Sequence, residues 1–231
     1  MGVAGMFRNR AEAGRLLAER LLHYRGKDVV VLALPRGGVP VAAEIARALD
    51  APLDLMLVRK VGAPGQPELA LAAIAGSGGE ELVINSEIAE ATGLDAAAIG
   101  RLAYAERPEL ARRRANYLAG RSPVPLAGRT AILVDDGIAT GATVRAALRA
   151  LRRAAPAGIV LAVPVAPAEV LAALRAEVDV IICVETQLYL GSVGAYYASF
   201  PQVSDAEVIE MLAAAGPAKP MTRSPAAPGG Q

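Results

Sequence analysis

Apolar runs of strand length alternate with amphipathic segments along most of the chain. The runs contain little polar alternation, which is typical of strands whose two faces are both covered. The pattern predicts strands at 28–34, 53–58, 130–134, 158–163 and 178–184, and helices at 10–24, 39–49, 141–154, 167–176 and 205–215. Such alternation forms right-handed βαβ units, so we expect an α/β fold with a doubly wound, mainly parallel sheet and flanking helices.

Two stretches depart from this alternation. Residues 60–79 contain seven glycine and proline residues, too many for one regular element, and are expected to form a loop. Residues 86–120 are expected to be helical. The arginines at 112–114 lie at helical spacing from Glu106 and Glu109, which favours a solvated helix face over a polyanion site.

The end of the chain differs in composition from the rest. Residues 216–231 are rich in proline, alanine and glycine and cannot bury a core, so we expect a disordered tail. Residues 6–215 contain no internal repeat and no sign of a second domain. We therefore expect one domain at 6–215.

Composition excludes several classes of protein. The chain has 24 Lys+Arg against 23 Asp+Glu, a net charge of +1, so it lacks the basic excess expected of a nucleic-acid binder. Cys183 is the single cysteine, so an internal disulfide is excluded. We expect Cys183 to be a small core residue. No apolar stretch reaches the roughly 18 residues needed to span a membrane, and the first residues lack a signal-peptide pattern, so we expect a cytoplasmic protein. His23 is expected at the surface.

The turn after the strand at 130–134 holds the richest chemistry. Ligands of parallel α/β sheets bind beyond the carboxyl ends of the strands, where this turn is expected to lie. Its polar and flexible positions are Asp135, Asp136, Gly137, Thr140, Gly141 and Thr143. Threonine hydroxyls and free N–H groups at a helix start suit a phosphate monoester, and the acids suit ribose hydroxyls or magnesium-bound water. The pattern indicates a sugar-phosphate site.

The segment 134–143 resembles the signature with which type I phosphoribosyltransferases bind 5-phosphoribosyl-1-pyrophosphate (PRPP). The resemblance implies PRPP contacts from Asp135, Asp136, Gly137, Ile138, Ala139, Thr140, Gly141, Ala142 and Thr143. It also implies a Mg²⁺ cofactor, held by Asp135 and Asp136 through water. Further matching segments spread over 6–215 are similar to stand-alone, functionally unassigned bacterial members of this family.

Two more segments resemble parts of the same family. The turn containing Arg36, Gly37 and Gly38 is similar to its pyrophosphate loop, whose amides and arginine would contact PRPP. Arg59 and Lys60 resemble the start of the mobile catalytic loop of adenine-type members. This implies that both cations face the pyrophosphate and that the loop at 60–79 closes over the reaction centre.

The proton acceptor and the base pocket follow from the resemblance as well. Ala139 replaces the aspartate that serves as base in the hypoxanthine-guanine branch, so Glu68 is the candidate general base, with a helix-start glutamate as the alternative reading. Glu185, Tyr189 and Leu190 would form a small C-terminal hood over a nucleobase. Alternatively, the tyrosines of this segment pack the C-terminal helix onto the sheet.

The resemblance implies transfer of the phosphoribosyl group of PRPP to a nitrogenous base with release of pyrophosphate. It also implies a homodimer, and PRPP and a nucleobase-like acceptor as the ligands. Two alternatives remain open: a non-catalytic PRPP-binding regulator, and a phosphoribosyl or nucleotide phosphohydrolase that uses water as the acceptor.

Overall fold

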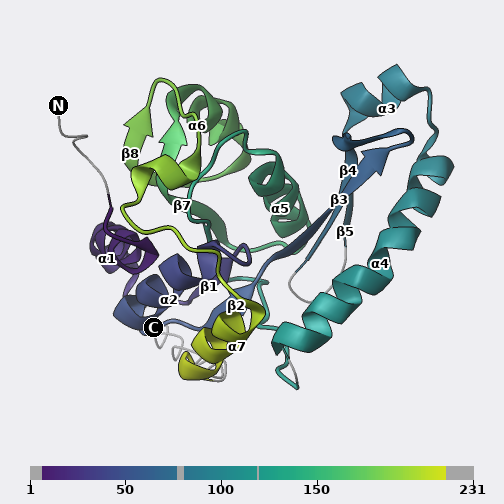
Figure 1. Cartoon of the computed structure of the whole chain (residues 1–231). Helices are drawn as coiled ribbons and strands as arrows, with labels where there is room; N and C mark the ends of the chain where they lie inside the picture. The colour runs from purple at the N-terminus through teal and green to yellow at the C-terminus, as the bar shows by residue number, and fades with distance from the viewer. Residues whose placement is uncertain (1–6, 77–80, 119, 217–231) are drawn as a thin grey trace, which may run out of the picture.

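The computed structural model describes residues 7–76, 81–118 and 120–216 and contains a five-stranded parallel sheet (Figure 1). The strands, in spatial order, are β2 (Leu53–Leu55), β1 (Val29–Ala33), β6 (Thr130–Val134), β7 (Gly158–Pro167) and β8 (Val180–Gln187). Every neighbouring pair is parallel. The predicted doubly wound, mainly parallel α/β fold is confirmed.

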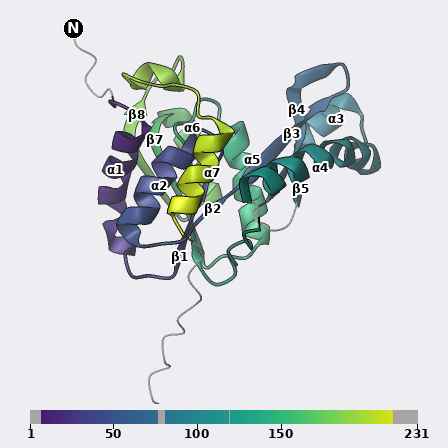
Figure 2. The same ribbon diagram turned by 60° about the horizontal axis from the view of Figure 1, so that its bottom comes forward.

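Helices cover both faces of this sheet. One face carries α1 (Arg10–Leu21), α2 (Gly38–Leu49) and α7 (Asp205–Ala214), which Figure 2 shows side by side. The other carries α5 (Ala142–Arg153) and α6 (Ala168–Leu174). Among the described residues there are also three short 3-10 helices: η1 (Leu22–Tyr24), η2 (Arg175–Glu177) and η3 (Val193–Tyr196).

The uniformly apolar strands follow from this double cover. In β1, Val29 and Val31 face the core beneath α1 and α2, whereas Val30 and Leu32 face the core beneath α5 and α6. Because successive side chains of a strand point to opposite faces, a strand covered on both sides needs apolar residues at every position. All five residues of β1 are accordingly buried.

A second, antiparallel sheet projects from the first, and its presence corrects the prediction for 60–79. It consists of β3 (Leu57–Ala63), β4 (Gln66–Gly76) and β5 (Glu81–Ile84). The expected loop is therefore largely a β-hairpin. Within the described residues 60–76, the glycines and prolines lie at or near the hairpin turn, at the strand ends and at the register shifts around Gly62, where breakers are tolerated. Residues 77–79 of the predicted loop lie outside the described residues.

The predicted strand at 53–58 is likewise divided between two sheets. β2 pairs with β1, Met56 is buried between the sheets, and β3 pairs with β4. The helices α3 (Ser86–Thr92) and α4 (Ala96–Leu118) follow in the region predicted as helical. In both views α4 runs along the second sheet and ends near α7 (Figures 1 and 2).

Several local predictions can be compared with the structure. His23 is exposed, as expected, and Arg112 and Arg113 form ion pairs with Glu109 on the surface of α4. Cys183 is half-buried rather than fully in the core. The predicted tail lies, beyond Gly216, outside the described residues. Within the described ranges, no helix is both long and apolar enough to cross a membrane.

Asp54 stabilises the junction between β2 and the segment before β6. Its Oδ1 accepts from the amide of Leu55 at 2.7 Å and its Oδ2 from the amide of Val124 at 2.8 Å. Burial raises the pKa of this carboxyl, although the two amides oppose the rise. The side chain therefore satisfies two backbone donors at a site that disfavours its charge.

We predict that Asp54→Ala lowers the free energy of unfolding by about 2–4 kcal/mol, because two buried amides lose their acceptor. Urea unfolding followed by circular dichroism measures this. Glu210→Ala, at an exposed position on α7, is the control and should leave the urea midpoint unchanged. A wild-type midpoint for Asp54→Ala would show that water replaces the carboxylate.

Candidate functional site

Two acids end the central strand β6 at the carboxyl edge of the sheet. The amide of Asp136 donates to Oδ1 of Asp135 at 2.9 Å, which fixes the first carboxylate beside the second residue's backbone. Burial raises the pKa of Asp135 well above its usual range, and the neighbouring charge of Asp136 raises it further. Burial also raises the pKa of Asp136, while Arg10 opposes the rise. The pair is costly to hold as two anions without a cationic partner.

Arg10 supplies part of that compensation from the start of α1. Its Nε lies 2.7 Å from Oδ2 of Asp136, and both side chains are largely buried. The guanidinium also donates to the carbonyl of Pro201 at 2.7 Å and lies 3.6 Å from the centre of the Phe200 ring. The sequence did not assign Arg10 to the site, because an arginine in an amphipathic helix resembles a solvated residue.

Tyr197 holds the backbone of the same acid. Its hydroxyl donates to the carbonyl oxygen of Asp136 at 2.6 Å, and its ring packs against Phe7 and Phe200. Burial, reinforced by the Asp136 charge, raises the pKa of this phenol far above neutrality, so it remains a hydrogen-bond donor. Tyr197 therefore fixes the backbone of the acid pair.

The turn between β1 and α2 lies directly against the acids. A Cβ added to Gly37 would lie 2.0 Å from Oδ2 of Asp136, and one added to Gly38 would lie 2.7 Å from the carbonyl oxygen of Val134. Glycine is thus required at both positions by close approach. The side chain of Arg36, which was expected to contact PRPP, extends toward α7, where its Nη1 lies 3.5 Å from Oδ1 of Asp205.

The turn after the acids leads into an uncapped helix start. The amide of Ile138 donates to the carbonyl of Val165 at 2.9 Å, which anchors the turn to β7. Gly141 has a φ of 77°, in the left-handed region, and no side chain caps the amino end of α5. First-turn amides lack acceptors within a helix, so this end can bind an anion. Thr140 is exposed beside it and Thr143 is half-buried.

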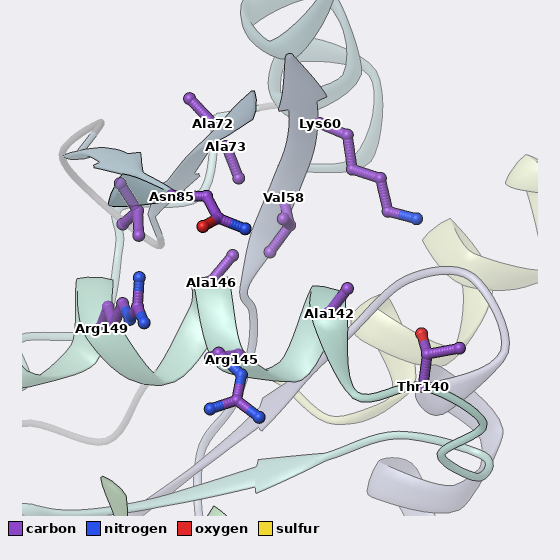
Figure 3. Close-up of a pocket in the computed structure, with 11 residues that line it drawn as sticks. Val58, Lys60, Ala72, Ala73, Asn85, Thr140, Ala142, Arg145, Ala146 and Arg149 are labelled. Carbon is purple, nitrogen blue, oxygen red and sulfur yellow. The ribbon is translucent and has the colours of Figure 1, made fainter. Parts of the chain in front are cut away.

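A cleft of about 170 Å³ separates α5 from the second sheet (Figure 3). Lys60 and Thr140 both line this cleft. In Figure 3 the Lys60 side chain projects from β3 toward the end of the cleft where Thr140 lies. Ala142 and Ala146 face the sheet across the cleft. The structure thus brings Lys60 to the predicted phosphate-binding turn.

Arg59 points to the other side of the second sheet. Its Nε lies 2.7 Å from Oε2 of Glu106 on α4. The structure therefore separates the two cations that the resemblance placed together at the pyrophosphate, because neighbouring residues of a strand face opposite ways. Glu68, the candidate base, belongs to β4, and its side chain lies outside the described part of the structure.

The three predicted base-pocket residues lie in or just after β8, the last strand of the main sheet along the chain. Glu185 is half-buried on β8 and is paired in register with Val165 of β7. Leu190 packs into the small cluster that contains Phe7 and Tyr197. Tyr189 is 83% exposed, so its ring is accessible to a ligand or solvent.

The acid pair provides oxygen ligands of the type that Mg²⁺ prefers. Among the described residues, no group of three or more His, Cys, Asp or Glu side chains could hold a metal. Asp135 and Asp136 therefore fit magnesium only as partial ligands, with the remaining oxygens supplied by water and substrate. This is the usual situation for Mg²⁺ bound with substrate phosphates.

Comparison with known proteins agrees with this arrangement. The family described as "Phosphoribosyl transferase domain" matches residues 7–198. Proteins of two Mycobacterium tuberculosis strains, each named "Putative phosphoribosyl transferase", are 46% identical over 207 residues, which are 90% of this chain and 46% of theirs. The chain thus spans about half the length of these curated relatives. The crystal structure of TT1426 from Thermus thermophilus is 42% identical, covers 90% of this chain and 97% of that one, and has a TM-score of 0.79.

The chain belongs to the phosphoribosyl transferase domain family. The match includes the Arg36–Gly38 turn, the cation pair at 59–60 and the acidic turn.

Proposed function

We propose that this protein is a magnesium-dependent transferase that moves the phosphoribosyl group of PRPP to a nitrogenous base and releases pyrophosphate. One observation carries the proposal: a partly buried acid pair stands beside the uncapped amino end of α5, at the carboxyl edge of a parallel sheet. A ligand that presents ribose hydroxyls and a phosphate monoester matches both halves of this arrangement.

Each end of PRPP then has its own set of residues. The amides at the start of α5, with Thr140 and Thr143, bind the 5-phosphate, and Asp135 and Asp136 bind the ribose hydroxyls. The glycine turn and Lys60 face the pyrophosphate, where positive charge stabilises the leaving group. Mg²⁺, when bound, supplies additional charge neutralisation for the phosphates.

The acceptor binds on the side of β8 in this proposal. Glu185 accepts a hydrogen bond from the base, and Tyr189 with Leu190 covers its ring. Glu68 removes the proton that the acceptor nitrogen loses as its bond to C1 of the ribose forms. The homodimer and the cytoplasmic location remain predictions.

Calorimetric titration of the purified chain with PRPP, with and without Mg²⁺, tests the binding step. We expect binding that strengthens with Mg²⁺. Candidate purine, pyrimidine and nicotinate-type acceptors are then screened for pyrophosphate release, and the products are analysed. A nucleotide formed only with an acceptor supports transfer. Ribose 5-phosphate formed without an acceptor would identify a hydrolase, and binding without any turnover would identify a regulator.

Glu68→Gln tests the assignment of the general base. We expect kcat to fall about 100-fold or more while the Kd for PRPP changes less than about threefold, because a general base acts on the transition state and not on donor binding. Steady-state kinetics and calorimetry measure the two quantities. Glu81→Gln, on the neighbouring strand β5, is the matched control. Parallel losses in kcat and PRPP affinity would assign Glu68 a structural role instead.

A further inference from the structure

A second polar cavity, of about 270 Å³, lies where the turn before α2 meets α4 and α7. Its side chains come from three separated parts of the chain: Arg36, Arg112, Arg113, Asn116, Tyr117 and Asp205. It shares no lining residue with the cleft beside α5. Its volume exceeds that of several water molecules, so it has room for a small polyatomic anion.

The charges that line this cavity do not balance. Three guanidinium groups face a single carboxylate, Asp205. That carboxylate already accepts from the Tyr117 hydroxyl at 2.6 Å and from Nδ2 of Asn116 at 3.5 Å, besides its ion pair with Arg36. Positive charges gathered in a concave site raise the local concentration of anions.

Glu109 holds the two α4 arginines without lining the cavity. It accepts from Nε of Arg112 at 2.8 Å and from Nε of Arg113 at 2.9 Å. Among the hydrogen bonds of the described residues, those of Arg113 use Nε alone, which leaves its two terminal amino groups for a ligand. A guanidinium fixed on one side presents a fork that matches phosphate oxygens.

The cavity adjoins the proposed PRPP site through one turn. Gly37 packs against Asp136, and the preceding residue, Arg36, sends its side chain into the cavity. A phosphate-type anion held by Arg36 would therefore lie one residue away from the turn that faces the acid pair. This inference extends the proposed function, because pyrophosphate is its product and also one end of its donor substrate.

We propose that Arg36, Arg112, Arg113 and Asn116 form a binding site for a pyrophosphate group. Arg112 and Arg113 are the new elements of this assignment, since their pattern in the sequence favours a solvated helix face. The shared chemistry is a multiply charged diphosphate. Its source is either free pyrophosphate or the pyrophosphate end of PRPP.

Calorimetric titration of the full chain with inorganic pyrophosphate at fixed ionic strength tests the site. Arg112→Ala/Arg113→Ala should weaken pyrophosphate binding at least about tenfold, because charge-assisted contacts are lost. Arg101→Ala/Arg107→Ala removes the same charge from exposed positions of the same helix and should leave the affinity within about twofold. No binding by the wild-type chain, or equal losses in the two variants, would overturn the proposal.

Titrations of the same variant with PRPP and with pyrophosphate distinguish the two possible sources of the diphosphate. They also keep this test separate from the test of the proposed function. If PRPP affinity falls together with pyrophosphate affinity in Arg112→Ala/Arg113→Ala, the site takes the pyrophosphate end of PRPP. If only pyrophosphate affinity falls, the site takes free pyrophosphate. Titration with inorganic pyrophosphate uses no PRPP, so the arginine site is measurable even where PRPP does not bind.

Discussion

Asp135→Asn/Asp136→Asn is expected to bind PRPP at least about 100-fold more weakly than the wild-type chain. Hydrogen bonds to charged groups contribute about 1.5–3 kcal/mol each, and both carboxylates lose their charge in this variant. The Mg²⁺ dependence of binding should diminish as well, because the oxygen ligands become neutral. Calorimetry with PRPP measures both effects. Unchanged affinity would remove the acid pair from the site.

The charge of Asp135 does not itself stabilise the fold, so the Asp135→Asn part of this variant should leave the chain folded. Burial raises the pKa of Asp135 well above the ordinary aspartate value of 3.8, so its ionisation opposes folding. The folded state binds the proton more tightly than the unfolded state, and stability falls as pH rises from about that value through the folded pKa. Asparagine does not ionise, so the stability of Asp135→Asn should depend less on pH over this range. Glu169→Gln, at an exposed position of α6, is the control for both measurements.

Arg10→Met is expected to lower the free energy of unfolding by about 3–5 kcal/mol, the range for removing one member of a buried ion pair. Asp136 then remains largely buried without its cation, and its carboxyl favours protonation even more strongly. PRPP binding should therefore weaken, and more so at lower pH. Urea unfolding and calorimetry across pH measure the two effects.

A second substitution distinguishes an ion-pair effect from a packing effect. Arg10→Met/Asp136→Asn should recover part of the lost stability, because no unpaired charge remains. Arg8→Met is the matched control: Arg8 is 79% exposed in its ion pair with Glu12, and its loss should leave the urea midpoint unchanged. Equal instability of Arg10→Met and the double variant would mean that Arg10 acts through Pro201 and Phe200.

The main sheet was predictable because its signals are local. The strand at 130–134 has the predicted bounds, and α7 begins after Ser204, which forms a capping box with Glu207. The prediction for β7 ended too early: the strand continues to Pro167, and α6 begins only at Ala168. A terminal proline is acceptable in a strand at its end, so it did not mark the boundary.

The second sheet was not predictable by the same means. The apolar run from Leu55 to Val58 passes through Met56, where the chain leaves one sheet and enters another. That change depends on which strands become neighbours, a non-local property that a hydrophobic run does not encode. The breakers in 60–79 suggested a loop, although antiparallel strands tolerate them at bulges and ends.

The site was predictable where residues are close in sequence. The turn from Asp135 to Thr143 leads into α5 as expected, and the glycines at 37–38 lie against the acids. Arg10 lies 126 positions before its partner Asp136, and Arg36 reaches Asp205 across the fold. Such pairs arise only from tertiary packing, so no motif indicates them.

The division of Arg59 and Lys60 between two faces limits how this part of the chain can change in length. The position of each cation along β3 decides which one lines the α5 cleft, because successive residues of a strand point to opposite sides. Deleting Val58 would exchange the faces of the two cations, placing the arginine on the side of the α5 cleft and the lysine on the side of Glu106. Insertions or deletions of two residues would preserve the arrangement, so only even changes in length keep Lys60 at the cleft.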